Sequence, residues 1–205
     1  MRTLATLVVS LTLAASAVPA GVGAQSVVVG AVGGRTESRL TRDREADSEA
    51  QANPLAGAWV EVSPGGPFVA ILAEATWSRR GGAYPAAFGE IGGTGVRADY
   101  LTATVAPTLR LGVGALSVYA YGGPTMELHV RTSAGSQVSA AFRDPAAQTF
   151  AVTAGAGAAV RFGAWEVRGE AREVVGLSSA YTHDEGDFGH RATEVLVRVG
   201  WRGGR

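Results

Sequence analysis

The segment richest in potential metal ligands lies near the C-terminal end of the chain. Two imidazoles and three carboxylates fall within the eight residues from His183 to His190. Oxygen ligands suit Ca²⁺ or Mg²⁺, but the spacing lacks the ordered carboxylates of a calcium-binding loop. Charges solvated in a loop explain the segment better. We therefore predict no metal site and no cofactor.

His129 and Ser133 are the pair that could support nucleophilic catalysis. A serine nucleophile requires a histidine base and a carboxylate that orients the histidine. The alternation of side chains places His129 on the same strand face as Glu127, where a histidine with a structural role is the ordinary interpretation. We predict no catalytic residue and no enzymatic activity.

Charged residues of both signs alternate with apolar residues along several segments of the chain. Arginine pairs with carboxylates through two parallel hydrogen bonds, so an enclosed face of such residues predicts a network of ion pairs. Six glutamates and six arginines are predicted to share this face: Glu61, Glu74, Arg110, Glu127, Arg131, Arg161, Glu166, Arg168, Glu170, Arg172, Glu194 and Arg198.

The composition limits the classes of protein to which the chain can belong. It has 205 residues, 46% of them hydrophobic, which suits one domain with a sizeable core. Basic and acidic residues both number 18, so no basic surplus indicates nucleic acid as a partner. Without cysteine, the chain forms no disulfide and offers no acceptor for an N-terminal lipid anchor.

Residues 1–24 have the pattern of a secretory signal peptide. Arg2 supplies the charged start, and the run from Leu4 to Val18 is apolar. The small residues from Val22 to Ala24 precede a suitable cleavage position at Gln25. The mature domain is therefore expected to span residues 25–205.

After Gln25 the apolar residues recur with a period of two, which is typical of β-strands. Long and short connections alternate between the strands, and the charged segment from Arg35 to Glu49 is predicted to be an exposed loop. Gly155 and Gly157 lie within a strand, where they are expected to relieve crowding. We predict eight strands: Ser26–Gly34, Leu55–Ser63, Phe68–Ser78, Arg97–Leu111, Leu116–Arg131, Phe150–Phe162, Trp165–Leu177 and Arg191–Arg202. Such a chain forms an up-and-down antiparallel barrel with all long loops at one end.

The alternation separates two faces of each strand without stating which face is enclosed. In the last strand Val195 and Val197 share one face, while Glu194 and Arg198 share the other. Glu173 is the clear exception to this pattern. An apolar exterior fits a barrel in lipid, whereas an apolar interior fits a soluble carrier of a small apolar ligand.

The aromatic residues of the apolar face favour the lipid-facing alternative. They fall at predicted strand ends, where rings anchor barrels at both membrane interfaces: Trp77, Phe150, Phe162, Trp165 and Trp201. An eight-stranded barrel has room only for side chains, so the charged face is expected to plug the lumen. We therefore predict an all-β fold, an eight-stranded antiparallel up-and-down transmembrane β-barrel.

The pattern beyond residue 24 resembles the small outer-membrane barrels of the OmpA/OmpX-like family. The resemblance rests on the signal peptide, the eight alternating strands and the final strand, in which the segment from Glu194 alternates up to the aromatic Trp201. Four further residues follow Trp201, which departs from the aromatic terminus of many such barrels. The resemblance implies a place in the outer membrane of a Gram-negative bacterium, contact with its lipids and lipopolysaccharide, insertion by the barrel-assembly machinery, and a monomeric state.

The expected function is that of a non-enzymatic envelope barrel. Its long extracellular loops are expected to serve a structural or surface-interaction role. Two alternatives stay open, because a fold does not by itself determine a function. One is a soluble extracytoplasmic carrier similar to lipocalins, and the other is an outer-membrane enzyme that modifies lipid A.

Overall fold

A computed structural model describes residues 26–42, 45–46, 49–66, 68–83, 95–133, 146–179, 181–183 and 186–203. The signal peptide expected at residues 1–24 lies outside these ranges. The elements within them are β1 (Ser26–Arg42), β2 (Glu45–Ala46), β3 (Glu49–Ser63), β4 (Val69–Ala83), β5 (Gly95–Val113), β6 (Leu116–Ser133), β7 (Gln148–Phe162), β8 (Trp165–Gly176), β9 (Tyr181–His183) and β10 (Gly186–Arg202). No helix in the described ranges is long and apolar enough to cross a membrane.

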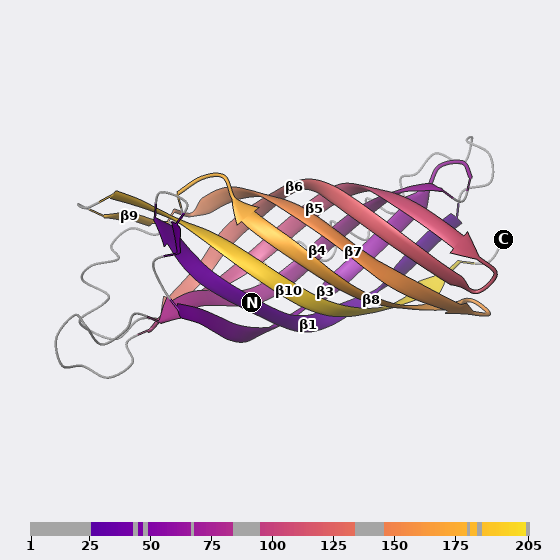
Figure 1. The fold of residues 1–205 in the computed structure, drawn as a ribbon, viewed down its shortest axis with the longest axis horizontal. Helices are drawn as coiled ribbons and strands as arrows, with labels where there is room; N and C mark the ends of the chain where they lie inside the picture. Colours follow the sequence, from indigo (N-terminus) through magenta and orange to yellow (C-terminus); the bar gives the residue numbers. More distant parts are fainter. Residues whose placement is uncertain are drawn as a thin grey trace.

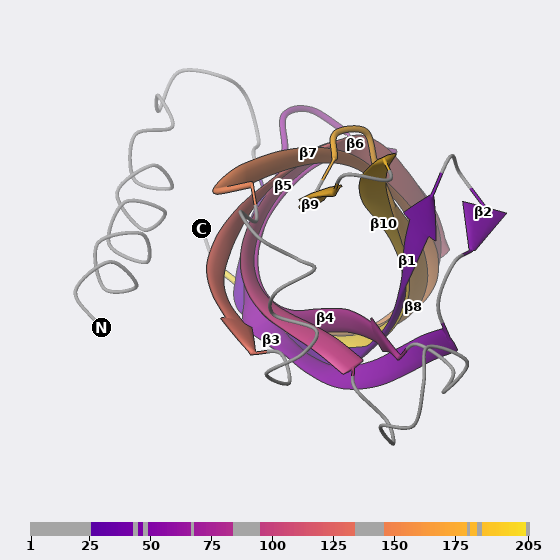
Figure 2. The same ribbon diagram turned by 90° about the vertical axis from the view of Figure 1, so that its left-hand side faces the viewer.

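Eight of the strands form one closed antiparallel barrel. Each pairs with its neighbour in the order β1, β3, β4, β5, β6, β7, β8 and β10, and β10 pairs with β1 to close the ring (Figure 2). The short strands β2 and β9 pair with the ends of β1 and β10. The structure confirms the predicted all-β fold and the eight-stranded, antiparallel, up-and-down architecture.

The strands are staggered as they pass around the barrel. A ladder of paired residues runs from Glu166 in β8 once around the barrel to Gly176 in the same strand, through Gly200, Gly30, Trp59, Glu74, Thr104, Thr125 and Ala151. After one circuit of the barrel, the ladder thus reaches β8 at Gly176, ten residues along the strand from Glu166, where it began. Such a stagger accompanies a strand tilt of about 35–45°, and Figure 1 shows the strands crossing the long axis obliquely. Tilt brings side chains from strands that are not neighbours together in the lumen.

The short connections lie at one end of the barrel, which we call the short-turn end (Figure 1). β5 and β6 are joined through Gly114 and Ala115, and β7 and β8 through Gly163 and Ala164. Gly114 and Gly163 have φ angles of 62° and 61°. Glycine adopts this left-handed region without the steric penalty of a Cβ atom. The strand ends that lead into the long connections are at the opposite end, called here the long-connection end.

The strands extend further toward the long-connection end than the sequence pattern predicts. β1 continues to Arg42 instead of ending near Gly34. Ser38 is paired with Ala192 of β10 on one side and with Gln51 of β3 on the other. The prediction of a loop from residue 35 is wrong for residues 35–42, because β10 supplies pairing partners along this whole stretch and β3 supplies them as far as Ser38.

Apolar side chains point outward and charged side chains point inward. On β10, Val195 and Val197 are 62% and 56% exposed, whereas Glu194 and Arg198, which flank them in the sequence, are fully buried. The same alternation runs along β7 and β8. The structure therefore confirms that the apolar face is the exterior of the barrel.

Candidate functional site

The lumen holds two clusters of ion pairs. We call the one near the short-turn end the lower cluster and the one toward the long-connection end the upper cluster. The lower cluster consists of Glu61 on β3, Arg110 on β5, and Glu166 and Arg168 on β8. Arg110 donates to Glu61 at 2.8 Å and to the two oxygens of Glu166 at 3.1 and 3.2 Å. Arg168 donates to Glu61 at 2.6 and 2.9 Å and to Glu166 at 2.5 Å. Two guanidinium groups thus balance two carboxylates, and all four side chains are buried.

The upper cluster lies above it toward the long-connection end. Arg172 donates from Nη1 to Glu74 at 2.5 Å and from Nε to Glu194 at 2.6 Å. Arg198 pairs with Glu74 and donates to both oxygens of Glu170 at 2.8 Å. Glu74 therefore lies between two guanidinium groups, and Glu194 continues the chain of pairs upward.

Arg80 and His190 complete the upper cluster. Arg80 on β4 donates to Glu194 at 3.1 Å and to Glu127 on β6. His190 on β10 lies with Nε2 2.8 Å from a carboxylate oxygen of Glu127. Four carboxylates thus face three guanidinium groups and one imidazole, and all eight side chains are buried.

Several of these ion pairs connect strands that are not neighbours in the sheet. Arg172 on β8 reaches Glu74 on β4, and Arg110 on β5 reaches Glu61 on β3. The narrow, staggered barrel makes these contacts possible because it brings opposite walls within the length of an arginine side chain. Removing one partner of a buried pair leaves the charge of the other partner buried without a counter-charge. This lowers the stability of the fold by about 3–5 kcal/mol.

Tyr119 and Tyr121 attach the β6 wall to the upper cluster. Their hydroxyl groups donate to the two oxygens of Glu170 at 2.7 and 2.8 Å. Tyr119 is paired with Gly157 of β7, and Tyr121 with Gly155. A Cβ atom on Gly157 would lie 2.8 Å from the Tyr119 hydroxyl and 2.4 Å from a β8 carbonyl oxygen. The predicted role of these two glycines in relieving crowding is confirmed.

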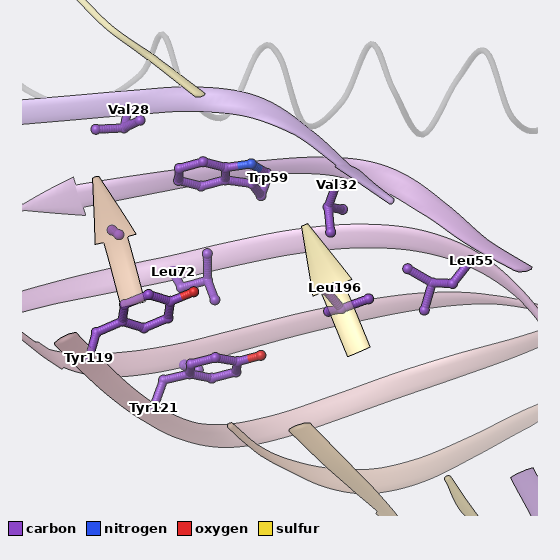
Figure 3. Packing of buried hydrophobic residues seen from close by; sticks show 10 residues of the cluster. Val28, Val32, Leu55, Trp59, Leu72, Tyr119, Tyr121 and Leu196 are labelled. Carbon is purple, nitrogen blue, oxygen red and sulfur yellow. The ribbon is translucent and has the colours of Figure 1, made fainter. Parts of the chain in front are cut away.

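Apolar side chains share the lumen with the ion pairs, an arrangement that the alternation does not predict. The cluster consists of Val28, Val32, Leu55, Trp59, Leu72, Ala106, Tyr119, Tyr121, Ala159 and Leu196 (Figure 3). Trp59 is 2% exposed and donates from Nε1 to the Ala31 carbonyl oxygen at 3.1 Å. The Arg168 guanidinium lies 4.2 Å from its ring centroid, a favourable cation–π arrangement. The ring thus links the apolar cluster to the lower cluster.

Ten of the twelve charged residues predicted for the lumen network lie in the two clusters. The exceptions are Arg131 and Arg161. Arg131 is exposed near the long-connection end of β6, and Arg161 is half-buried at the short-turn end of β7. The Arg161 guanidinium donates from Nη2 to the Gly114 carbonyl oxygen at 3.5 Å and not to a carboxylate of the clusters. The prediction that these two arginines belong to the lumen network is wrong, because both lie near strand ends and neither is fully buried.

Arg80 and His190 are network members that the sequence reasoning missed. The predicted strands ended at Ser78 and began at Arg191, which left both residues in loops. In the structure β4 extends to Ala83, and β10 begins at Gly186. The period-two pattern was the available signal, because Arg80 continues the inward positions of β4 and His190 those of β10.

All five aromatic residues predicted for the membrane interfaces point outward, and four of them lie near strand ends. The prediction that Trp77 ends its strand is wrong, because β4 continues to Ala83 and places Trp77 near its middle. Phe162, Trp165 and Trp201 are paired across β7, β8 and β10 at the short-turn end, and each is about half exposed. Phe150 is exposed near the other end of β7, and Trp77 is half-buried on β4. The three rings at the short-turn end and Phe150 thus lie toward opposite ends of the apolar outer surface.

Charged side chains occupy outward positions of β1, β8 and β10 toward the long-connection end. This outer charged belt consists of Arg35, Glu37, Arg39, Glu173 and Arg191. Arg191 donates from Nε to Glu173 at 2.7 Å, and Arg35 lies 3.6 Å from Glu37. Glu173, the exception in the sequence pattern, thus has a cationic partner on the neighbouring strand.

His129 lies at the long-connection end of β6, beyond Met126, the partner of Phe150. Its ring meets that of Tyr100 edge-to-face, with centroids 5.8 Å apart. The side chain of Ser133 lies outside the described part of the structure.

The candidate cation segment from His183 to His190 is described only in part. Asp184 and Glu185 fall outside the described residues, and the backbone of His183 pairs with Gly186. His190 belongs to the upper cluster instead of a loop. Among the described residues, no group of three or more His, Asp or Glu side chains is arranged to hold a metal ion.

No protein-family model and no curated protein sequence matches the chain. Solved structures of similar fold include outer membrane protein AlkL, determined by solid-state NMR in DMPC lipid bilayers, with a TM-score of 0.52 at 10% identity over 92% of this chain and 95% of AlkL. Neisserial surface protein A aligns with a TM-score of 0.49 at 7% identity, over 84% of this chain and 96% of its own. Ail of Yersinia pestis, in complex with the heparin analogue sucrose octasulfate, aligns with a TM-score of 0.45 at 12% identity, over 86% of this chain and 99% of its own.

At identities this low, the likeness concerns the fold alone. The alignment with AlkL carries the comparison, because it includes almost the whole of both chains. The fold of this chain is therefore that of the small outer-membrane β-barrels, as the resemblance to the OmpA/OmpX-like family implied.

Proposed function

We propose that this protein is an outer-membrane β-barrel of a Gram-negative bacterium. Its eight long strands cross the membrane, and its long connections face the outside of the cell. Its role is structural support of the envelope or contact with the surroundings, and it carries out no enzymatic reaction.

The inverted distribution of side chains is the observation that carries this proposal. Six glutamates and five arginines are buried in the lumen. Large apolar side chains are exposed on the outside: Ile71, Val105, Leu109, Leu111, Val118, Val130, Val160, Val195, Val197 and Val199. Soluble monomers rarely expose apolar patches of such extent, whereas lipid tails favour contact with them.

The ends of the apolar surface support the same membrane placement. Phe162, Trp165 and Trp201 at the short-turn end suit one interface, as aromatic rings do in outer-membrane barrels. At the other end, Arg35, Arg39 and Arg191 of the outer charged belt are exposed. Arginine suits contact with phosphate groups, so this belt supports lipopolysaccharide as a partner.

The filled lumen and the closed sheet support two further parts of the proposal. The ion pairs of both clusters and the apolar side chains around Trp59 plug the barrel against general diffusion of solutes. Pairing of β1 with β10 leaves no free edge among the eight barrel strands, which favours a monomer. Closure in the membrane is the step at which the barrel-assembly machinery would act.

The two alternative functions have less support. A lipocalin-like carrier requires an apolar lumen and a polar exterior, the opposite of the arrangement of Glu194 and Val195. A lipid A-modifying enzyme requires a serine, a histidine and a carboxylate in mutual contact. Nothing in the described part of the chain favours such a site at His129.

Replacing Val197 by arginine tests the placement of the outer surface in lipid. Val197 lies midway along the outer face of β10, between Trp201 and Arg191. An arginine near the bilayer midplane costs about 2–4 kcal/mol in a barrel. We expect Val197→Arg to reduce the folded fraction in outer-membrane preparations, measured by the heat-dependent gel shift that a detergent-stable barrel shows.

Thr193→Arg is the matched control, because Thr193 points outward on the same strand and is paired with Glu173 of the outer charged belt. An arginine near the interface costs about 0–1 kcal/mol, so this variant should fold like the parent. Recovery of the parent protein wholly in the soluble fraction contradicts the proposal, as does equal folding of both variants.

A further inference from the structure

The lumen opening at the short-turn end has more guanidinium groups than carboxylates to pair with them. We call this opening the lower mouth, formed by Arg110, Ser117, Arg161, Glu166 and Arg202. Arg202 on β10 is partly exposed, with Nη2 3.5 Å from Glu166. Repulsive electrostatic interactions link its guanidinium to those of Arg161 and Arg110. Together with the lower cluster, four guanidinium groups meet two carboxylates among the described residues of this region.

Three buried polar groups on adjacent strands of the lower mouth have no hydrogen-bond partner among the described residues. They are Nε of Arg110 on β5, Oγ of Ser117 on β6 and Nε of Arg161 on β7. Arg161 also donates its backbone N–H to the Ala115 carbonyl oxygen at 2.8 Å, which places it beside the start of β6. Arg110 is only 8% exposed. Burial of charged donors without acceptors is costly, so these groups favour an anionic acceptor.

We propose that the lower mouth binds an oxyanion of the phosphate class. Arg161 and Arg202 hold it at the opening, and Arg110 and Ser117 donate from further inside. Guanidinium groups suit phosphate because their N–H donors match its oxygens in pairs. The phosphate is either a free anion or the headgroup of a membrane phospholipid, since Trp165 and Trp201 place this end of the barrel at headgroup depth under the proposed function.

Inorganic phosphate is the first probe, used with the full chain refolded in maltoside micelles that contain no phosphate. Sodium phosphate is titrated against sodium chloride at constant ionic strength, because screening alone changes charged contacts. The arginine Nε–H signals in NMR spectra report on the site directly. We expect saturable shifts of a subset of these signals with phosphate and none with chloride.

Arg161→Gln/Arg202→Gln is the variant that tests the site. Arg161 pairs with no carboxylate of the lower cluster, and Glu166 keeps Arg110 and Arg168 when the longer contact of Arg202 is lost, so the heat-dependent gel shift should stay as in the parent. We expect phosphate affinity to fall by about tenfold or more, as loss of charge-assisted hydrogen bonds implies. Arg191→Gln, in the outer charged belt, should leave the affinity unchanged. If the double variant does not fold, Arg161→Gln alone is compared with the same control.

A second arm uses nanodiscs that contain phosphatidylglycerol. Shifts that match those with inorganic phosphate, seen without added phosphate, identify the lipid headgroup as the source, and shifts that need added phosphate identify a free anion. The proposal is overturned by linear shifts, by equal effects of chloride, or by unchanged affinity in the folded variant. These outcomes concern the lower mouth alone, because the gel shift and fractionation test the membrane barrel separately.

Discussion

Arg172 joins two carboxylates of the upper cluster that lie on different strands. It is 4% exposed and lies between Glu74 and Glu194, donating to each. Without this guanidinium, two carboxylates on different strands would face each other with only their remaining arginine partners. Buried pairs add little net stability over apolar packing, but breaking one leaves a charge that water cannot reach.

Arg172→Ala should therefore lower the free energy of unfolding by about 3–5 kcal/mol. Urea titration of the barrel in micelles, followed by the gel shift, measures this change. Arg191→Ala is the comparison, since the pair of Arg191 with Glu173 is exposed and such pairs contribute about 0–1 kcal/mol. Similar losses in both variants would contradict a structural role for the upper cluster.

Where β6 pairs with β7, large side chains on one strand lie opposite glycines on the other. Tyr119 and Tyr121 lie opposite Gly157 and Gly155, and the two tyrosine rings stack with centroids 6.4 Å apart. The glycines provide room for the rings to lie across β7 and reach Glu170 on β8. A larger side chain at either glycine would compete with the rings for the same volume.

Gly157→Val should destabilise the barrel by about 1–3 kcal/mol or more, as overpacking does. The reason is that its Cβ atom meets a backbone oxygen at 2.4 Å, which cannot move aside easily. Gly169→Ala, on the outward side of β8, is the matched control because a Cβ atom there has no neighbour within 4 Å. Urea titration should place that control within about 0.5 kcal/mol of the parent.

The elements also show which parts of the structure the sequence could predict. Alternation in the strand centres, as in Val195 and Val197 beside Glu194, located the strands and separated their two faces. Aromatic residues such as Trp165 and Trp201 then indicated that the apolar face lies outside. The strand ends were not predicted because their outward positions are polar or charged, as at Arg35 in β1. Apolar residues therefore do not recur at every second position there, and the pattern that indicates a strand is absent. Ion-pair partners such as Arg172 and Glu74 depend on the stagger of the whole barrel, which no single strand encodes.

At the scale of the whole molecule, the eight long strands form a narrow barrel with charged and apolar side chains in its lumen. The two clusters of ion pairs lie one above the other, and the apolar cluster around Trp59 lies among them. Eight strands enclose an interior that side chains can fill, unlike the water-filled channels of larger barrels. Specificity toward other molecules is then expected at the two ends of the barrel and on its outer surface.

The intact protein in planar lipid bilayers should show no steady conductance of the kind an open aqueous pore gives. The physical reason is that arginine and glutamate side chains bridge the lumen at several levels, for example between Arg172 and Glu74. Single-channel recording at moderate salt measures this directly, with an established large porin as the positive control. A stable, ohmic open state in the unmodified protein would contradict the plug.

Pairing of β1 with β10 has a consequence for the order of events during folding. The two strands share fifteen residue pairs, from Val28 with Arg202 to Arg42 with Phe188, although they lie at opposite ends of the described sequence. Contacts so distant along the chain form slowly, and unpaired strand edges are prone to aggregation. The backbone N–H and C=O groups on one edge of β1 therefore stay unpaired until β10 has been made and exported. Until β10 arrives, that edge of β1 needs protection from other unpaired strands.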